Sequence, residues 1–190
     1  MNEAETRRTL LLLRHAKASH SPGLQDIERP LTERGHRDAH AVGEQLVTWG
    51  IEPDLVLCSP AVRTRETWDG VTAAGVRAGR VEFSEPLYDA YWSDLVALVR
   101  ATSDQETTVL VVGHGPAIPD AARLLATDGE VGEDGEADTD HPVAPAVGPA
   151  RSRLVQSYPT SGLTRFTVEV PWVDLAPGTA RLDEFVVPRA

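Results

Sequence analysis

Arg14 and His15 stand directly behind an uninterrupted run of four leucines at 10–13. Four consecutive apolar residues are typical of a strand that is buried on both faces of a parallel sheet. In open α/β sheets, ligands bind just beyond the carboxyl ends of such strands. The pair therefore suggests a fixed cation and a nitrogen nucleophile at a ligand-binding edge, which is chemistry suited to a phosphoryl group. An isolated Arg-His pair is more often a surface salt-bridge partner, so this hypothesis depends on the rest of the chain.

The elements that must position this pair are indicated by the alternation of apolar runs with helix-like patterns over the first 126 residues. This alternation favours βαβ units around a mostly parallel sheet, and we expect an α/β fold with three layers, an α/β/α sandwich. Thr32 is placed to cap a helix that Gly50 ends, and Ser59 and Ser93 are placed to cap two more. A further helix is expected over 118–126. The expected strands are 9–13, 54–58, 80–83, 109–112, 163–170 and 180–187, the last with an antiparallel orientation left open.

Polar side chains follow four of the expected strands. Arg14 and His15 follow the first strand, Arg63 the second, Asp89 the third and His114 the fourth. Because the carboxyl ends of parallel strands meet at one edge of a sheet, we expect these side chains to converge. Two guanidinium groups hold phosphoryl oxygens by paired, charge-assisted hydrogen bonds, which lysine does not reproduce. The predicted site therefore clamps a phosphoryl dianion.

Each of the later residues also has a plainer interpretation. Taken alone, Arg63 is a solvated helix arginine, and His114, between two glycines, is a turn histidine satisfied by a backbone carbonyl. Asp89 is the weakest candidate, because two nearby arginines would keep its carboxylate ionised until substrate phosphate neutralises them. The convergence of all these residues on one edge is what favours a functional site.

Composition limits the class of protein. The chain has 190 residues with 41% hydrophobic content, which fits one domain over 1–190. The net charge of -11 argues against nucleic acid or an anionic membrane as partner, since both need clustered Lys and Arg. The single cysteine, Cys58, ends an apolar run and is expected to be a small buried hydrophobe. The charged residues at 1–8 and the early interruption of the apolar run favour a cytoplasmic protein over a secreted one.

An insertion is expected at 127–153. Positions 128–140 hold seven acidic residues and no basic one, and 142–149 are mostly Pro, Ala, Val and Gly. A segment that cannot bury apolar area stays unfolded, so we expect mobile loop there. A solvated insertion or lid edge is favoured over an interaction tail.

The chain contains four sequence motifs that make it resemble the histidine phosphatase superfamily, and within it the short SixA-type phosphohistidine phosphatases. The resemblance implies a phosphoglycerate mutase-like fold and a phosphorylated His15. It also implies that Arg14, Arg63 and His114 complete the phosphate pocket and that an acid at Asp89 protonates the leaving group. The motifs are Leu-Leu-Arg-His-Ala-Lys-Ala at 12–18, Arg-Pro-Leu-Thr-Glu-Arg-Gly at 29–35, Ser-Pro-Ala-Val-Arg-Thr-Arg-Glu-Thr at 59–67 and Val-Val-Gly-His at 111–114.

Two positions depart from the pattern of that superfamily. Ala16 stands where most members have glycine, which resembles the SixA-type subgroup and requires a backbone without strongly positive φ. Asp89 stands where many members carry glutamate, and its shorter side chain puts the acid role in doubt.

Residues and resemblance together predict a metal-independent phosphatase without a cofactor. Neutral His15 attacks phosphorus in line, while Arg14, Arg63 and a cationic His114 stabilise the charge of the transferring group. Asp89 or water protonates the leaving group, and water then hydrolyses the phosphohistidine.

The expected partner is a phosphohistidine protein or a phosphorylated small molecule, and the sequence does not choose between them. Lys17 is a candidate contact for a substrate anion, although a solvated loop residue is an equal interpretation. The oligomeric state is left open as well.

Two alternative functions are weighed against this one. A phosphomutase must hold and re-donate the phosphoryl group in a closed pocket, and the short chain offers little material to build one. A phosphate-sensing or protein-binding module would keep the pocket without turnover, and the intact set of basic residues argues against a dead pocket.

A metal site is a third alternative, suggested by His36 and His40 at helical spacing. No third ligand has a recognisable spacing, so exposed helix histidines are the simpler interpretation.

Overall fold

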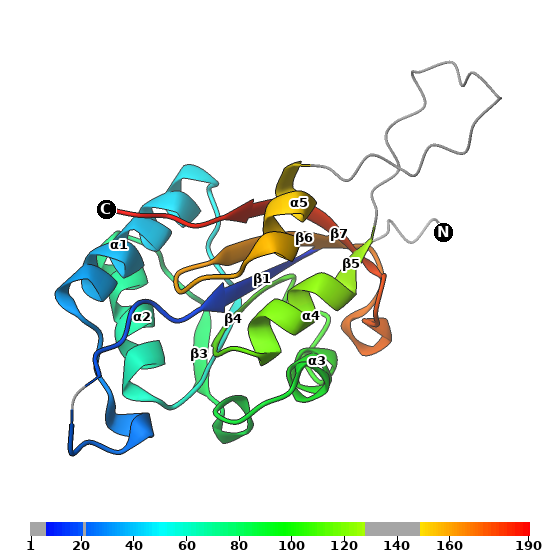
Figure 1. Cartoon of the computed structure of the whole chain (residues 1–190). Helices are drawn as coiled ribbons and strands as arrows, with labels where there is room; N and C mark the ends of the chain where they lie inside the picture. Colours follow the sequence, from blue (N-terminus) through cyan, green and yellow to red (C-terminus); the bar gives the residue numbers. More distant parts are fainter. Residues whose placement is uncertain (1–6, 21, 128–148) are drawn as a thin grey trace, which may run out of the picture.

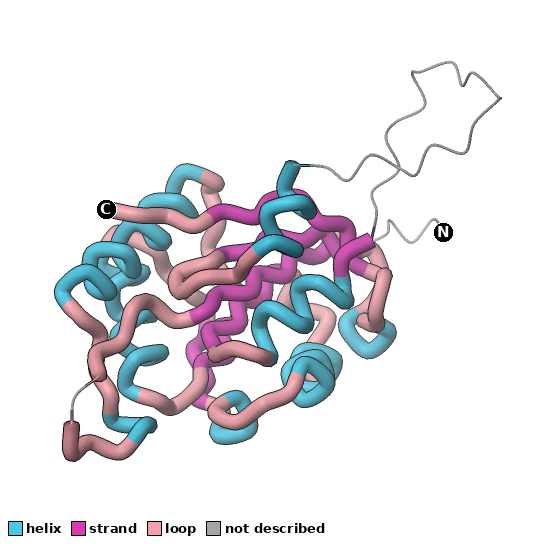
Figure 2. Tube along the Cα trace, viewed as in Figure 1, coloured by secondary structure: helices cyan, strands magenta, loops and turns pink. Residues whose placement is uncertain are grey.

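The leucine run at the start of the chain forms a central strand of a seven-stranded sheet in the computed structural model, which describes residues 7–20, 22–127 and 149–190. Helices cover both faces of this sheet, as Figures 1 and 2 show. The predicted α/β/α sandwich is confirmed. The strands are β1 (Arg8–Arg14), β2 (Leu55–Cys58), β3 (Arg80–Phe83), β4 (Thr108–Gly113), β5 (Ala126–Thr127), β6 (Leu163–Val168) and β7 (Ala180–Val186).

The sheet is mixed, and its parallel half carries the predicted site. The strand order is β3-β2-β4-β1-β6-β7-β5. Strands β3, β2, β4 and β1 pair in parallel, so their carboxyl ends meet at one edge. Strand β6 is antiparallel to β1, and β7 is antiparallel to β6. The sequence leaves the orientation of the last strand undecided. In the structure this strand, β7, is antiparallel to β6 and parallel to β5.

The helices form two layers because alternate residues of β1 point to opposite faces of the sheet. Leu11 and Leu13 pack with side chains of α1 and α2, whereas Leu10 and Leu12 pack with those of α3, α4 and α5. All four leucines are fully buried. The helices are α1 (Glu33–Thr48), α2 (Val62–Ala73), α3 (Trp92–Arg100), α4 (Ala117–Leu125) and α5 (Pro149–Gln156), with 3-10 turns η1 (Asp26–Glu28), η2 (Glu85–Leu87) and η3 (Trp172–Asp174).

The predicted helix starts are correct in one case and wrong in two. Thr32 caps α1 as expected, since its side chain accepts from the N–H of Gly35. The predicted cap at Ser59 is wrong: α2 begins at Val62 with Ala61 as its N-cap, because the Ser59 hydroxyl contacts a histidine instead. Ser93 is also not a cap. Helix α3 begins at Trp92, two residues before the expected start, and the carboxylate of Asp94 accepts from the backbone N–H of Tyr91, the N-cap.

The expected insertion at 127–153 is only partly described. Its acidic part and the stretch after it, 128–148, lie outside the described residues. Thr127 belongs to β5, and 149–153 lie in α5, so the two ends are strand and helix rather than loop. Leu154 of α5 is fully buried in the core, and apolar contact is the physical reason why this end is ordered.

Helices α1 and α2 approach closely at Gly43. A Cβ at Gly43 would lie 2.5 Å from the carbonyl oxygen of Val71 and 2.6 Å from the Cβ of Ala74. We therefore expect Gly43→Ala to lower the free energy of unfolding by about 1–3 kcal/mol through overpacking, despite the higher helix propensity of alanine. Urea denaturation measures this change. Equal or higher stability of the variant would contradict the close approach of the helices.

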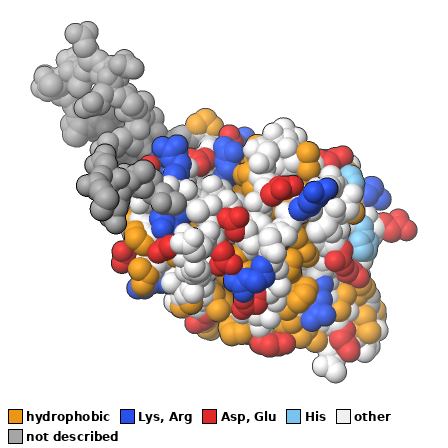
Figure 3. Space-filling view, turned by 180° about the vertical axis from the view of Figure 1, so that it is seen from behind, with side chains coloured by type: hydrophobic (Ala, Val, Ile, Leu, Met, Phe, Trp, Pro, Cys, Tyr) orange, Lys and Arg blue, Asp and Glu red, His pale blue; other side chains and the backbone are white. Residues whose placement is uncertain are grey.

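The surface carries charges of both signs. Figure 3, which views the molecule from behind, shows acidic and basic side chains interspersed on that face with hydrophobic ones between them. This face does not offer the continuous basic surface that nucleic acid requires. Among the helices of the described residues, none is both long and apolar enough to cross a membrane.

Candidate active site

The backbone at the end of β1 is held from both sides. The N–H of His15 donates to the carbonyl of Gly113 at 3.0 Å, and the N–H of Arg14 donates to the carbonyl of Gly162 at 3.0 Å. Ser161, at φ 61°, donates its N–H to the carbonyls of both Arg14 and His15. The end of β4 and the turn before β6 thus fix where the two side chains begin.

The ring of His15 is oriented by its own loop. Its Nδ1 lies 2.7 Å from the carbonyl oxygen of Ala16. A carbonyl can only accept, so Nδ1 carries the proton and Nε2 keeps its lone pair. Burial, aided by the charges of Arg63 and Arg14, lowers the pKa of His15 to about 4, although the bond to Ala16 opposes the shift. At neutral pH, His15 is therefore an uncharged ring with a free nucleophilic nitrogen.

Two buried nitrogens next to His15 have no hydrogen-bond partner among the described residues. Arg14 donates Nη1 to the carbonyl of Tyr158 at 2.6 Å, while its Nε is buried and unpartnered. His114 has Nε2 at 2.7 Å from the hydroxyl of Ser59, while its Nδ1 is buried and unpartnered. The ring centroids of His15 and His114 are 5.1 Å apart. Buried polar groups normally have partners, so this pair of nitrogens marks a place for a polar ligand.

His114 is neutral in the unliganded pocket. Burial, followed by the neighbouring ring of His15 and the charge of Arg63, lowers the pKa of His114 to about 3. The cationic form that we expected from the sequence is therefore not the resting form. A bound dianion would raise this pKa again, because an opposite charge favours the protonated ring.

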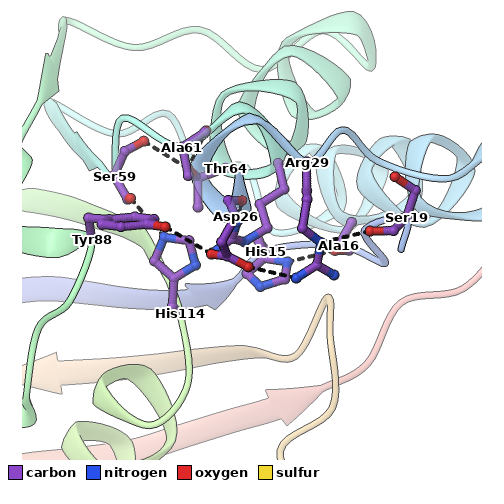
Figure 4. Close-up of polar contacts among 11 residues, drawn as sticks. His15, Ala16, Ser19, Asp26, Arg29, Ser59, Ala61, Thr64, Tyr88 and His114 are labelled. Atoms are coloured by element: carbon purple, nitrogen blue, oxygen red, sulfur yellow. Dashed lines mark hydrogen bonds and ion pairs between the residues drawn. The ribbon is translucent and has the colours of Figure 1, made fainter. Parts of the chain in front are cut away.

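Arg63 is held by Asp26, a residue that the sequence analysis missed. Arg63 donates Nη1 to the carbonyl of Asp26 at 2.6 Å and Nη2 to its carboxylate at 2.9 Å. The same carboxylate accepts from Arg29 at 2.7 Å and from the hydroxyl of Tyr88 at 2.9 Å. These bonds, the one from Arg29 above all, lower the pKa of Asp26 to about 2. In Figure 4, Asp26 lies between Tyr88 and Arg29, next to the two rings. A carboxylate that stays ionised thus fixes two cations of the site.

These residues surround a pocket of about 250 Å³ at the carboxyl edge of the parallel strands. The structure brings Arg14, His15, Arg63, His114 and Lys17 together there. Asp89 is exposed and does not line this pocket, so its role as acid remains a prediction. The pocket is lined by Arg14, His15, Lys17, Ala18, His20, Arg29, Arg63, His114, Gly115 and Thr160.

Cys58 and the helix histidines lie outside this pocket. Cys58 is fully buried as predicted, and burial raises the pKa of its thiol to about 12. His36 and His40 are exposed on α1, with ring nitrogens 3.9 Å and 3.6 Å from glutamate carboxylates. Their arrangement fits solvated side chains on the surface of the helix.

Known proteins match the chain over most of its length. The family model described as histidine phosphatase superfamily, branch 1, matches residues 10–95. An uncharacterized protein of Mycobacterium tuberculosis is 35% identical over 177 residues, covering 93% of this chain and 100% of the relative.

Two solved structures extend the match to the fold. A protein from Nakamurella multipartitia, provisionally assigned as phosphohistidine phosphatase SixA, shares 32% identity at a TM-score of 0.78, covering 97% of this chain and 98% of that one. A protein from Agrobacterium tumefaciens with the same provisional assignment shares 26% identity at a TM-score of 0.71, covering 95% and 98%.

This chain belongs to the histidine phosphatase superfamily, as the sequence motifs suggested. The family and its SixA-named relatives support a phosphatase activity. Arg14, His15, Arg63 and His114, which belong to the sequence motifs, all line the pocket.

The neutral rings predict a specific pH dependence. We expect His15 and His114 to remain uncharged as the pH falls from 6.5, since their pKa values lie near 4 and 3. The unfolded chain binds protons at the ordinary histidine pKa, so it binds more protons than the folded chain in this window. The free energy of unfolding therefore rises with pH between about 4 and 6.5.

Nitrogen NMR of the two rings measures this titration directly, and urea denaturation across the same range gives the linked change in stability. A His15 ring that titrates at its ordinary pKa in the folded protein would contradict the buried, cation-flanked environment.

Proposed function

We propose that the protein is a metal-independent phosphatase that hydrolyses a phosphohistidine or a small phosphoester through a phosphohistidine intermediate on His15. The observation that carries this proposal is the geometry of the pocket. His15, with its nucleophilic Nε2, lines the same pocket as Arg14 and His114, whose Nε and Nδ1 atoms are buried and have no partner among the described residues. That combination suits a group that is attacked at its centre and held by its oxygens.

The first step forms a bond between Nε2 of His15 and phosphorus as the bond from phosphorus to the leaving group breaks. Nδ1 keeps its proton on the carbonyl of Ala16, so attack needs no separate base. Arg14, Arg63 and His114 stabilise the charge on the phosphoryl oxygens. The leaving oxygen or nitrogen takes its proton from Asp89 or from water.

The second step is attack by water on the phosphohistidine. The nitrogen–phosphorus bond breaks, its electron pair returns to Nε2, and inorganic phosphate leaves. The same donors stabilise both steps, because the phosphoryl oxygens occupy the same positions. The cations of the pocket supply the electrostatic stabilisation that a metal ion provides in other phosphoryl-transfer enzymes.

The size of the pocket bears on the substrate. A volume of about 250 Å³ is larger than a phosphoryl group, so it also holds part of the molecule that carries the group. A large carrier such as a protein extends out of the pocket past the exposed Lys17. This arrangement suits a phosphohistidine side chain on a protein surface as well as a small ester. The provisional assignments of the two solved relatives favour the phosphohistidine protein.

A substrate panel tests the proposed function. The purified protein is assayed with a chelator present against a phosphohistidine protein, sugar phosphates, nucleotides and an activated aryl phosphate. We expect release of inorganic phosphate, with the phosphohistidine protein giving the highest kcat/KM. Transfer of the phosphoryl group to a second substrate hydroxyl would indicate a mutase instead. Tight phosphate binding without turnover on any member of the panel would indicate a sensing module.

The contribution of Asp89 is expected to depend on the leaving group. Asp89→Asn should leave measurable activity on an aryl phosphate, whose leaving group needs no proton, and lower kcat more strongly on an alkyl phosphate. The ratio of the two kcat values measures this. An equal loss on both substrates would contradict a role for Asp89 as acid.

A further inference from the structure

Ser59 lies behind His114, on the side of the ring away from the unpartnered Nδ1. It is fully buried, and its N–H donates to the carbonyl of Val112 at 3.0 Å, so the backbone fixes its place. Its hydroxyl oxygen lies 2.7 Å from Nε2 of His114. Figure 4 shows Ser59 reaching from the turn before α2 to this ring. No sequence motif used for the proposed function gives the hydroxyl a role.

The turn does not need this hydroxyl to hold its shape. Thr64 provides the side-chain bonds of the turn: its hydroxyl is 2.8 Å from the carbonyl of Ser59 and 2.7 Å from that of Ala61. The predicted capping bond from Ser59 to α2 is absent among the described contacts. His114 is thus the one partner that the structure shows for the Ser59 hydroxyl.

A neutral imidazole has one proton, and its position decides what the pocket can bind. With the proton on Nε2, the lone pair of Nδ1 would face phosphoryl oxygens and repel them. With the proton on Nδ1, the same nitrogen donates a hydrogen bond to them. The second arrangement requires that Nε2 accepts, and a hydroxyl can supply the donor, whereas a carbonyl or a carboxylate cannot.

We propose that Ser59 is a positioning residue that donates its hydroxyl hydrogen to Nε2 of His114 and so keeps the ring proton on Nδ1, facing the phosphoryl group. This inference rests on the proposed function only in taking a phosphoryl group as the acceptor of the hydrogen bond from Nδ1. The position of the proton on the His114 ring does not depend on whether the protein hydrolyses a substrate. The hydroxyl also serves after His114 is protonated beside a bound dianion, because it can rotate and accept from Nε2–H. One serine thereby keeps its bond to the ring in both charge states.

Nitrogen NMR of the His114 ring, combined with phosphate binding, tests the proposal in Ser59→Ala. In the unmodified protein we expect a proton on Nδ1. In Ser59→Ala we expect a mixture of both tautomers, weaker binding of inorganic phosphate, and a fall in kcat/KM of about tenfold, the equivalent of one hydrogen bond. Thr64→Val is the matched control, since it removes a buried hydroxyl from the same turn. It should lower stability and leave the tautomer and the phosphate affinity unchanged.

Three results would overturn the proposal: a proton on Nε2 in the unmodified protein, an unchanged tautomer in Ser59→Ala, or the same shift of tautomer in Thr64→Val. Tautomer and phosphate affinity are read without substrate, so they remain decisive if the protein proves to bind phosphate without hydrolysing it. In that case the proposed function fails and the role of Ser59 is judged separately.

Discussion

Replacing His15 with asparagine should abolish turnover and leave a pocket that still binds phosphate. Asparagine can place an amide N–H near the position of Nδ1 and keep the bond to the carbonyl of Ala16, but it has no counterpart of the nucleophilic Nε2. We expect kcat/KM to fall by roughly a millionfold, the scale of loss when an enzyme loses its nucleophile. Steady-state hydrolysis of an aryl phosphate measures the loss, and calorimetry with inorganic phosphate measures the binding.

His40→Asn is the control for this variant, because it changes an exposed histidine of α1 that lies outside the pocket. It should hydrolyse the same substrate at the unmodified rate. Activity of His15→Asn close to that of the control would remove His15 from the chemistry.

The second large loss of activity is expected when Arg63 is replaced, even by a residue that keeps the positive charge. Two nitrogens of its guanidinium are bonded to Asp26, so phosphoryl oxygens must be held by N–H groups that remain on the same rigid plane. A lysine ammonium keeps the charge but cannot satisfy Asp26 and a phosphoryl group at once. We expect Arg63→Lys to lower kcat/KM by about a hundredfold, the cost of losing one fixed donor to a developing charge.

Arg65→Lys is the matched control. Arg65 is on the same helix, exposed, and stacked over Phe83 outside the pocket. Its replacement should change kcat/KM less than about threefold, as expected for a surface site. Equal effects of the two substitutions would show that Arg63 contributes only long-range charge.

The fold could be predicted from the sequence wherever the pattern is local. Buried runs gave the strands β1, β2 and β4 of the parallel half, because a strand covered on both faces must be apolar throughout. Helix α5 was missed, since its short apolar pattern follows a stretch of Pro, Ala, Val and Gly and its order depends on Leu154 reaching the core. The starts of α2 and α3 were misplaced because the local cap signals competed with tertiary and neighbouring contacts.

The candidate site could be predicted only as far as its residues follow strands. Arg14, His15 and His114 were placed by topology, because the carboxyl ends of paired parallel strands are adjacent. Asp26 carries no such signal, as it lies in the short 3-10 turn η1 and meets Arg63 at a separation of 37 residues. Ser59 had a local interpretation as a helix cap that masked its contact with His114. Contacts between loops depend on how the whole chain packs, and short-range patterns do not encode them.

The central claim is that His15 carries the phosphoryl group on Nε2, and one measurement tests it most directly. The protein is mixed with a phosphorus-labelled substrate, quenched in alkali within a single turnover, and the phosphorylated nitrogen is identified by phosphorus–nitrogen coupling in the isolated peptide. We predict phosphate on Nε2 of His15, because Nδ1 is bonded to the carbonyl of Ala16. Hydrolysis without label on His15, or label on its Nδ1, would contradict the mechanism.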